Sequence, residues 1–409
     1  MSLESEADVP GEAALPGTLP EALRAELIAF RRDLHMHPEL ANQEFRTTAA
    51  IKARLERAGL EPRVLPGGTG LLCDIGGVPG RPDGPTRLAL RADIDALPIP
   101  DVKNACAYRS TVPDRAHACG HDVHTTVVLG TGLVLAGLAE RGLLPRPVRL
   151  IFQPAEEVLP GGADDVIAAG ALEGVHRILA VHCDPRVDAG RIGLREGPIT
   201  SACDRVEIAL DGPGGHTARP HLTTDLVTAA ARVATDAPAL IARRVDSRSG
   251  LSLTWGRIES GHAANVIPQH AELSGTVRCL ALDTWRQAPD VVVAAIDEIA
   301  NLHRAKSEIT YVRGVPPVVN EVTSVELLQT AMVARRGTDS VESTEQSLGG
   351  EDFSWYLERV PGAMARLGVR PPGERAVRDL HQGDFDVDEH AITVGVELFT
   401  AAALIDTAP

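Results

Sequence analysis

The chain has 409 residues, of which 44% are apolar and 23% charged, a composition typical of a soluble globular protein with two domains. Its formal net charge of -16 argues against nucleic acid as a partner, because binding a phosphate backbone requires a basic patch. Residues 1–19 lack the basic and apolar regions of a signal peptide, and no apolar run appears long enough to span a bilayer. We therefore expect a disordered tail, a cytoplasmic protein and no membrane partner.

The first ordered elements lead to a pair of aspartates. Residues 20–59 have the spacing of two helices, the second ending at Gly59. Two β-rich runs follow at 69–77 and 86–97, and the second ends in Asp93 and Asp95. Carboxylates at the end of a buried strand lie where α/β sheets place their chemistry.

The most informative stretch is the loop AHACGHDVHTT at residues 116–126. Cys119 and His121 are two residues apart, a spacing at which both side chains of an extended segment point the same way. Gly120 between them permits a tight turn. The apolar spacing of the following residues predicts a long buried helix. Clustered His and Cys residues in one loop favour a metal or catalytic site.

Two further strands carry candidate ligands at their ends. One spans 148–152 and leads into a loop with Glu156 and Glu157, and the next ends at His182. Strands that alternate with helices predict an α/β domain with a mostly parallel sheet and a site at one edge.

The pattern changes at residues 201–314. Their order β-α-β-β-α-β is that of a ferredoxin-like α+β domain. Helix and strand alternation returns after this segment, together with a His- and acid-rich motif around His381. We therefore expect a discontinuous metal-binding domain, formed by 20–200 and 315–409, with 201–314 inserted as a lid.

The residues so far collected suit two adjacent divalent ions. A catalytic zinc commonly uses three protein ligands and an open position, whereas five donors can hold two ions that share a bridging ligand. One of Glu156 and Glu157 would be a ligand and the other a base on the attacking water. The candidate ligands are Cys119, His121, one of Glu156 and Glu157, His182 and His381.

These motifs resemble the M20 metallopeptidase family, and most closely its amidohydrolase subgroup of aminoacylases, hippurate hydrolases and auxin–amino acid conjugate hydrolases. The resemblance runs from about residue 31 to 403. The matching segments are RADIDALPI at 91–99, HACGHDVHT at 117–125, FQPAEE at 152–157, GGHTARPH at 214–221, NVIP at 265–268, GTVR at 275–278, GGEDFSWY at 349–356 and LHQGDFDVDEH at 380–390.

The resemblance implies a dinuclear-metal hydrolase domain with an inserted lid that mediates homodimerisation. Glu156 would be the general base and then the acid, and Asp93 would orient a ligand imidazole. Arg91 stands where many relatives have His; because Arg cannot bind a cation, the Cys-containing loop would replace that ligand. The implied metal ligands are Cys119, His121, Glu157, His182 and His381.

The expected reaction is hydrolysis of an N-acyl amino acid, as in an aminoacylase. A metal-activated water attacks the carbonyl carbon, and His216 from the lid helps to hold the oxyanion. Asn265 and Arg278 are candidates for binding polar groups of the substrate, Arg278 for its carboxylate. Zinc is the expected metal, because Cys and His are its usual ligands, with manganese, cobalt or nickel as alternatives.

Three alternatives remain open from the sequence. A dipeptidase or carboxypeptidase could use the same scaffold, although peptidase branches more often have Asp in place of Cys119. An inactive metal-binding homologue would have no use for Glu156 as a free base. A hydrolase with Cys119 as nucleophile would need a separate base and a residue that orients it, and neither is evident.

Overall fold

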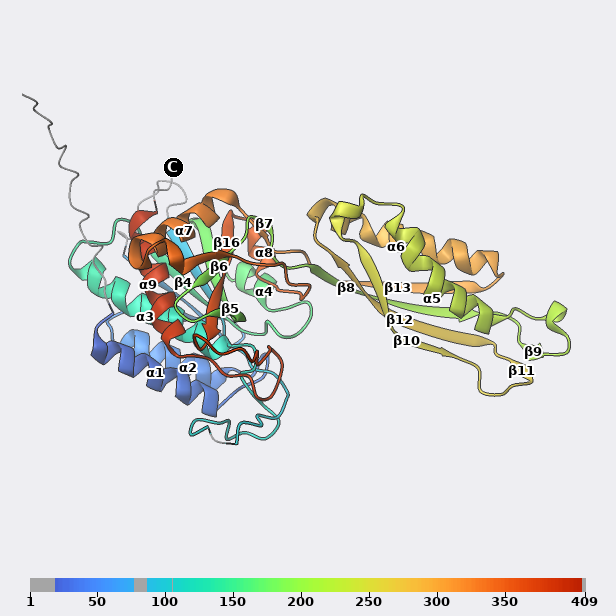
Figure 1. Ribbon diagram of the computed structural model, residues 1–409, viewed down its shortest axis with the longest axis horizontal. Helices are drawn as coiled ribbons and strands as arrows, with labels where there is room; N and C mark the ends of the chain where they lie inside the picture. Colours follow the sequence, from blue (N-terminus) through green and yellow to red (C-terminus); the bar gives the residue numbers. More distant parts are fainter. Residues whose placement is uncertain (1–18, 77–86, 105, 407–409) are drawn as a thin grey trace, which may run out of the picture.

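The computed structural model describes residues 19–76, 87–104 and 106–406, so the predicted tail lies almost wholly outside the described residues. Two bodies are joined through the strands β8 (Ala202–Asp211) and β13 (Lys306–Val315). The larger holds an eight-stranded sheet and the smaller a four-stranded sheet (Figure 1).

The large sheet is parallel at its centre. Its order is β1-β2-β4-β3-β5-β16-β6-β15, and the pairs β4/β3, β3/β5 and β5/β16 are parallel. Both faces of these strands are covered, which explains the nearly unbroken apolar runs of β3 and β4. The strands are β1 Arg63–Val64, β2 Leu71–Ile75, β3 Arg87–Asp93, β4 Val148–Gln153, β5 Val175–Asp188, β6 Ile192–Leu194, β15 Val341–Ser343 and β16 Gly362–Arg370.

Helices cover both faces of this sheet. Alternate residues of β3 enter different hydrophobic clusters, Leu88 and Leu90 on one face and Ala89 on the other. The first cluster packs against α1 (Glu21–Met36), α2 (Phe45–Glu56), α3 (His121–Glu140), α7 (Val322–Arg336) and α9 (His390–Ile405). The second packs against α4 (Ala163–Ala168) and α8 (Ser354–Leu357). The predicted mostly parallel α/β sheet is therefore confirmed.

Helix α3 corrects one expectation from the sequence. No apolar run was expected to be long enough to span a bilayer, yet this helix has 20 residues and, judged by length and composition alone, could cross a membrane. Its apolar side chains instead pack against α1, α9 and the sheet, and 78% of its most apolar window is buried inside the protein. The helix is apolar because it lies in the core.

The smaller body has an antiparallel sheet with two helices on one face. The sheet order is β10-β12-β8-β13, and chain order runs β8, α5 (Leu226–Ala242), β10 (Ser252–Ser260), β12 (His270–Cys279), α6 (Leu282–Leu302), β13. Alternate residues of β12 are buried against these helices. This is the β-α-β-β-α-β order read from the sequence.

Short elements complete both bodies. The pair β9 (Gly215–His216) and β11 (Val266–Ile267) forms the far tip of the smaller body, away from the large sheet (Figure 1). The others are β7 Gly197–Pro198, β14 Val319–Asn320 and the 3-10 turns Pro220–Leu222, Ser247–Ser249 and Thr338–Ser340.

Strand β5 extends six residues beyond His182, where the sequence analysis ended it. Its pairing with β3 stops at Ala180, but its pairing with β16 continues to Asp188. His182 therefore lies within a strand, at the point where one neighbouring strand ends and leaves room beside it.

Candidate metal centre

The loop before α3 brings a thiol and an imidazole to the edge of the large sheet. Gly120 links them with a φ of +86°, a conformation that favours glycine. A Cβ at Gly120 would also lie 2.6 Å from the sulfur of Cys183, so this position has no room for a side chain. Cys119 precedes this turn and His121 begins the helix.

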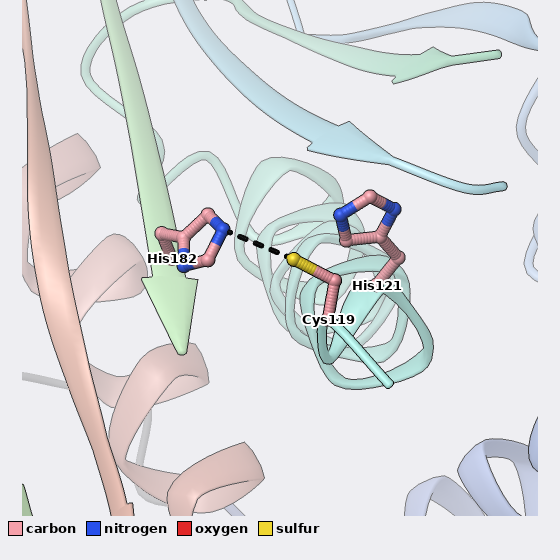
Figure 2. A group of neighbouring side chains, drawn as sticks. All are labelled: Cys119, His121 and His182. Carbon is pink, nitrogen blue, oxygen red and sulfur yellow. Dashed lines mark hydrogen bonds between the residues drawn. The ribbon is translucent and has the colours of Figure 1, made fainter. Parts of the chain in front are cut away.

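Cys119, His121 and His182 converge on one point (Figure 2). The sulfur of Cys119 is 3.5 Å from Nε2 of His182. Nδ1 of His182 lies 2.9 Å from the carbonyl of Cys183, and Nδ1 of His121 lies 2.9 Å from the carbonyl of Asp95. Each Nδ1 therefore donates a proton, and in the neutral ring Nε2 then carries the lone pair that a cation can take. Nε2 of His121 is buried without a hydrogen-bond partner among the described residues.

A second donor group uses the same sulfur. Cys119, Glu157 and His381 offer ligand atoms within 4.8 Å of one another. Nε2 of His381 is 3.5 Å from Oε1 of Glu157, a buried oxygen that accepts no hydrogen bond from a described residue. The backbone N–H of His381 donates to the carbonyl of Ala118 at 2.8 Å, which ties the C-terminal loop to the cysteine loop.

The donor set fits two divalent cations that share Cys119. Burial and the carboxylates of Glu157 and Glu156 raise the pKa of the Cys119 thiol well above its usual range. A thiolate at this place needs a cation beside it, and a coordinated thiol is deprotonated. Nε2 of His121 and Oε1 of Glu157, which are 3.7 Å apart and have no hydrogen bond to a described residue, complete the fit.

Glu156 faces a different set of neighbours. Glu156, Glu351 and Asp352 form a further group of neighbouring side chains, and all three are acidic. Oε2 of Glu156 is also 3.9 Å from Nε2 of His121. Its side chain is only 10% exposed. Burial, followed by the charges of Glu351 and Glu157, raises the pKa of Glu156 well above its usual range. A carboxyl group in this setting can hold a proton near neutral pH.

Asp93 contacts a histidine outside the predicted ligand set. Its Oδ1 lies 2.6 Å from Nδ1 of His124, whose Nε2 accepts the backbone N–H of Cys183 at 2.8 Å. Both nitrogens of His124 are therefore used. Asp93 was expected to orient a ligand imidazole, but Nδ1 of the ligand His121 donates its hydrogen bond to the carbonyl of Asp95.

Arg91 occupies the space behind the acidic group. It is fully buried and contacts Asp93 and Asp352 at 2.7 Å each, and Glu351 at 3.1 Å. Its Nε donates to Gln153 at 2.9 Å. The sequence analysis gave Arg91 no such function, because Glu351 and Asp352 lie about 260 residues away along the chain.

Glu44 holds the turn that presents the two glutamates, which the sequence analysis also missed. Its Oε1 accepts the backbone N–H of Ala155 at 2.8 Å. Ala155 has a φ of +60°, unusual for a residue with a side chain. Burial raises the pKa of Glu44 to about 7.

The lid residues divide into two classes. Arg278 lines a cavity of about 400 Å³ together with Cys119, Glu156 and His381, and its guanidinium donates to the carbonyl of Leu348. His216 and Asn265 are exposed on and beside the β9/β11 tip, and this tip lies away from the large sheet whose residues line the cavity (Figure 1). Within one chain, therefore, the structure does not bring His216 or Asn265 to the candidate centre.

We predict that Glu44→Gln changes the pH dependence of stability. Between about pH 4.5 and 7, folded Glu44 retains a proton that the unfolded chain releases, so wild-type stability falls as pH rises through this window. Glutamine does not titrate and keeps an oxygen for the Ala155 N–H. The variant should match wild type at pH 5 and exceed it by about 1–3 kcal/mol at pH 8 in urea denaturation.

The control for this prediction is Glu56→Gln, which changes an exposed glutamate at the end of α2. An equal stability difference between Glu44→Gln and wild type at both pH values would contradict the assignment.

Comparison with known proteins supports the metal-binding reading. The family model described as peptidase family M20/M25/M40 matches residues 89–405. The Bacillus subtilis YXEP protein, whose crystal structure is described as a dinuclear metal-binding peptidase of family M20, is 35% identical with a TM-score of 0.81; the match covers 94% of this chain and 98% of that one.

Sequence relatives extend this comparison. A Bacillus subtilis protein named N-acetylcysteine deacetylase is 37% identical over 386 residues, 94% of this chain and 98% of its own. A Rhodococcus jostii protein with a glutamate–cysteine ligase name is 46% identical over 381 residues; the match covers 93% of this chain but only 47% of that protein. Other matched relatives are named amidohydrolase and carboxypeptidase.

Proposed function

The chain belongs to peptidase family M20, and from this premise we propose that it hydrolyses the amide bond of N-acyl amino acids. Membership makes it a hydrolase of a metal-binding family; the substrate class is our proposal. The observation that carries it has two parts. Two donor groups share Cys119, and the buried carboxyl group of Glu156, which belongs to neither of them, lies close enough to take part in proton transfer. The deacetylase name of the Bacillus relative supports an N-acyl substrate.

The proposed mechanism assigns one task to each residue. Ions held by the two donor groups would act as Lewis acids and lower the pKa of a bound water. Glu156 takes a proton from the water as it attacks the carbonyl carbon, and later gives that proton to the departing amine. A raised pKa makes the ionised Glu156 a stronger base for the first step, and the carboxyl group formed by that proton transfer is the acid of the second step. Arg278 on β12 lies across the cavity and can bind a polar group of the substrate.

Zinc is the metal we propose, because sulfur and imidazole donors are those it usually takes, with manganese, cobalt and nickel as the alternatives to be tested. We also propose that the protein acts in the cytoplasm. A nucleophilic Cys119 is disfavoured. Burial raises the pKa of Cys119 and lowers the pKa of His182, so the pair is neutral without a cation.

The second candidate function is a dipeptidase or carboxypeptidase. The carboxypeptidase name of one relative favours it, and the same catalytic groups would serve. The two functions differ in the group that precedes the scissile bond: a simple acyl group or an amino acid.

The test is amine release from N-acetyl, N-benzoyl and indole-acyl amino acids and from dipeptides. Metal-stripped protein is reloaded separately with zinc, manganese, cobalt or nickel. We expect N-acyl amino acids to be the best substrates, and Glu156→Ala to lower kcat by about 10²–10⁴-fold without loss of bound metal.

Glu326→Ala, an exposed change on α7, is the matched control and should leave activity unchanged. Preference for dipeptides would favour the second function. Metal-loaded wild type that cleaves nothing on the panel would contradict the proposal.

We further propose that the protein is a homodimer through the lid and that His216 acts in the partner's site. Its exposed position at the tip supports this, because within its own chain it lies far from the cavity. His216→Ala and Glu156→Ala should each be inactive alone. When they are mixed and allowed to exchange subunits, heterodimers contain one intact site, so about a quarter of wild-type activity should return. No recovery despite demonstrated exchange would contradict action across the dimer.

A further inference from the structure

Arg366 is a buried cation in the wall of the candidate site. It lies on β16, directly paired with His182 on β5, and lines the cavity that also contains Cys119, Glu156 and His381. Only 6% of the residue is exposed. Its side chain therefore approaches the cavity from the large sheet, whereas Arg278 approaches it from the lid.

The guanidinium of Arg366 has no partner in the described part of the chain. Four described arginines are buried, and the other three each contact a carboxylate at 2.7 Å: Arg31 with Asp122, Arg91 with Asp93, and Arg149 with Asp74. Arg366 makes no such contact with a carboxylate of any described residue. Its Nη2 is buried, and no described residue accepts a hydrogen bond from it.

An unpaired buried guanidinium is costly. Removing a cation from water is strongly unfavourable unless an anion compensates for it. Asp184, Glu351 and Cys119 favour the charged form of Arg366 from a distance, Arg186 opposes it, and burial lowers its pKa below the usual value. Because arginine stays charged in proteins, the side chain is an anion-binding group whose anion is not supplied by a direct contact from this chain.

The geometry points to a carboxylate of the substrate as that anion, bound by Arg366 beside the metal ligands; this inference rests on the proposed hydrolysis of N-acyl amino acids. The planar guanidinium donates two parallel hydrogen bonds to a carboxylate, which fixes orientation as well as charge. Arg278 is less suited to this task, because it is half-buried and already donates to the Leu348 carbonyl. The carboxylate belongs either to the amino acid half or to a dicarboxylic acyl group.

Equilibrium binding tests this inference without catalysis. Zinc-loaded Glu156→Ala protein is titrated by calorimetry with N-acetyl-methionine, with N-acetyl-methioninamide, and with N-succinyl-methioninamide, which carries its only carboxylate on the acyl group. Adding Arg366→Met should weaken binding of one carboxylate probe by roughly 10- to 100-fold and leave the uncharged amide unchanged.

Two further variants separate recognition from charge balance. Arg366→Lys keeps the charge but loses the planar fork, so we expect it to lose much of the carboxylate affinity while it retains zinc and thermal stability. Arg370→Met, on the same strand and paired with Asp188 at the surface, is the matched control and should bind all probes as the parent does.

The outcomes decide both the inference and its source. A loss confined to N-acetyl-methionine assigns Arg366 to the amino acid carboxylate, and a loss confined to the succinyl probe assigns it to the acyl group. Equal effects of Arg366→Met on all three probes would overturn the inference. It would also be overturned if Arg366→Met loses zinc or unfolds while Arg366→Lys binds the probes as the parent does. Carboxylate-dependent binding by a protein whose wild type hydrolyses no N-acyl amino acid would keep the site and reject the proposed function.

Discussion

The arrangement depends on one buried thiol. Cys119 is buried in the wall of the cavity, where burial and the charges of Glu157 and Glu156 raise its pKa, so a thiolate there requires cations. Both donor groups include its sulfur, so the position of the loop that carries Cys119 affects both groups. Gly120 makes the turn because no side chain fits there, and the contact between Ala118 and His381 brings the C-terminal loop to the same point.

The surrounding charges explain how a centre with so many acids remains folded. Arg91 compensates Asp93, Glu351 and Asp352 from behind, and Asp95 fixes His121 through its carbonyl and Glu157 through its carboxylate. Glu156 faces the cavity, and its burial, followed by the charges of Glu351 and Glu157, raises its pKa. Arg366, in the wall of the same cavity, differs from Arg91 because its buried Nη2 has no hydrogen-bond partner among the described residues.

The sequence predicted what local patterns encode. The structure brings the five predicted donor residues together: three lie in loops, His121 begins α3 and His182 lies within β5. Their residue types, and the spacing of Cys119 and His121, indicated a metal. The sequence could not assign the contacts of Asp93 or locate Glu44 and Arg366, because these depend on pairing between strands and loops far apart in the chain. The predicted end of β5 at His182 was wrong for the same reason, because β5 continues by pairing with β16, about 180 residues later in the chain. His216 was expected at the site because its segment, GGHTARPH, resembles the family motif, but its position depends on how the lid is placed.

The most direct test is the metal content of single variants after equilibration with zinc, measured by mass spectrometry alongside protein concentration. If Cys119 is shared by both donor groups, wild type should bind two ions per chain and Glu157→Ala and His182→Ala one each. Cys119→Ala should lose both ions. A Cys119→Ala protein that is folded and still binds two ions would contradict the account.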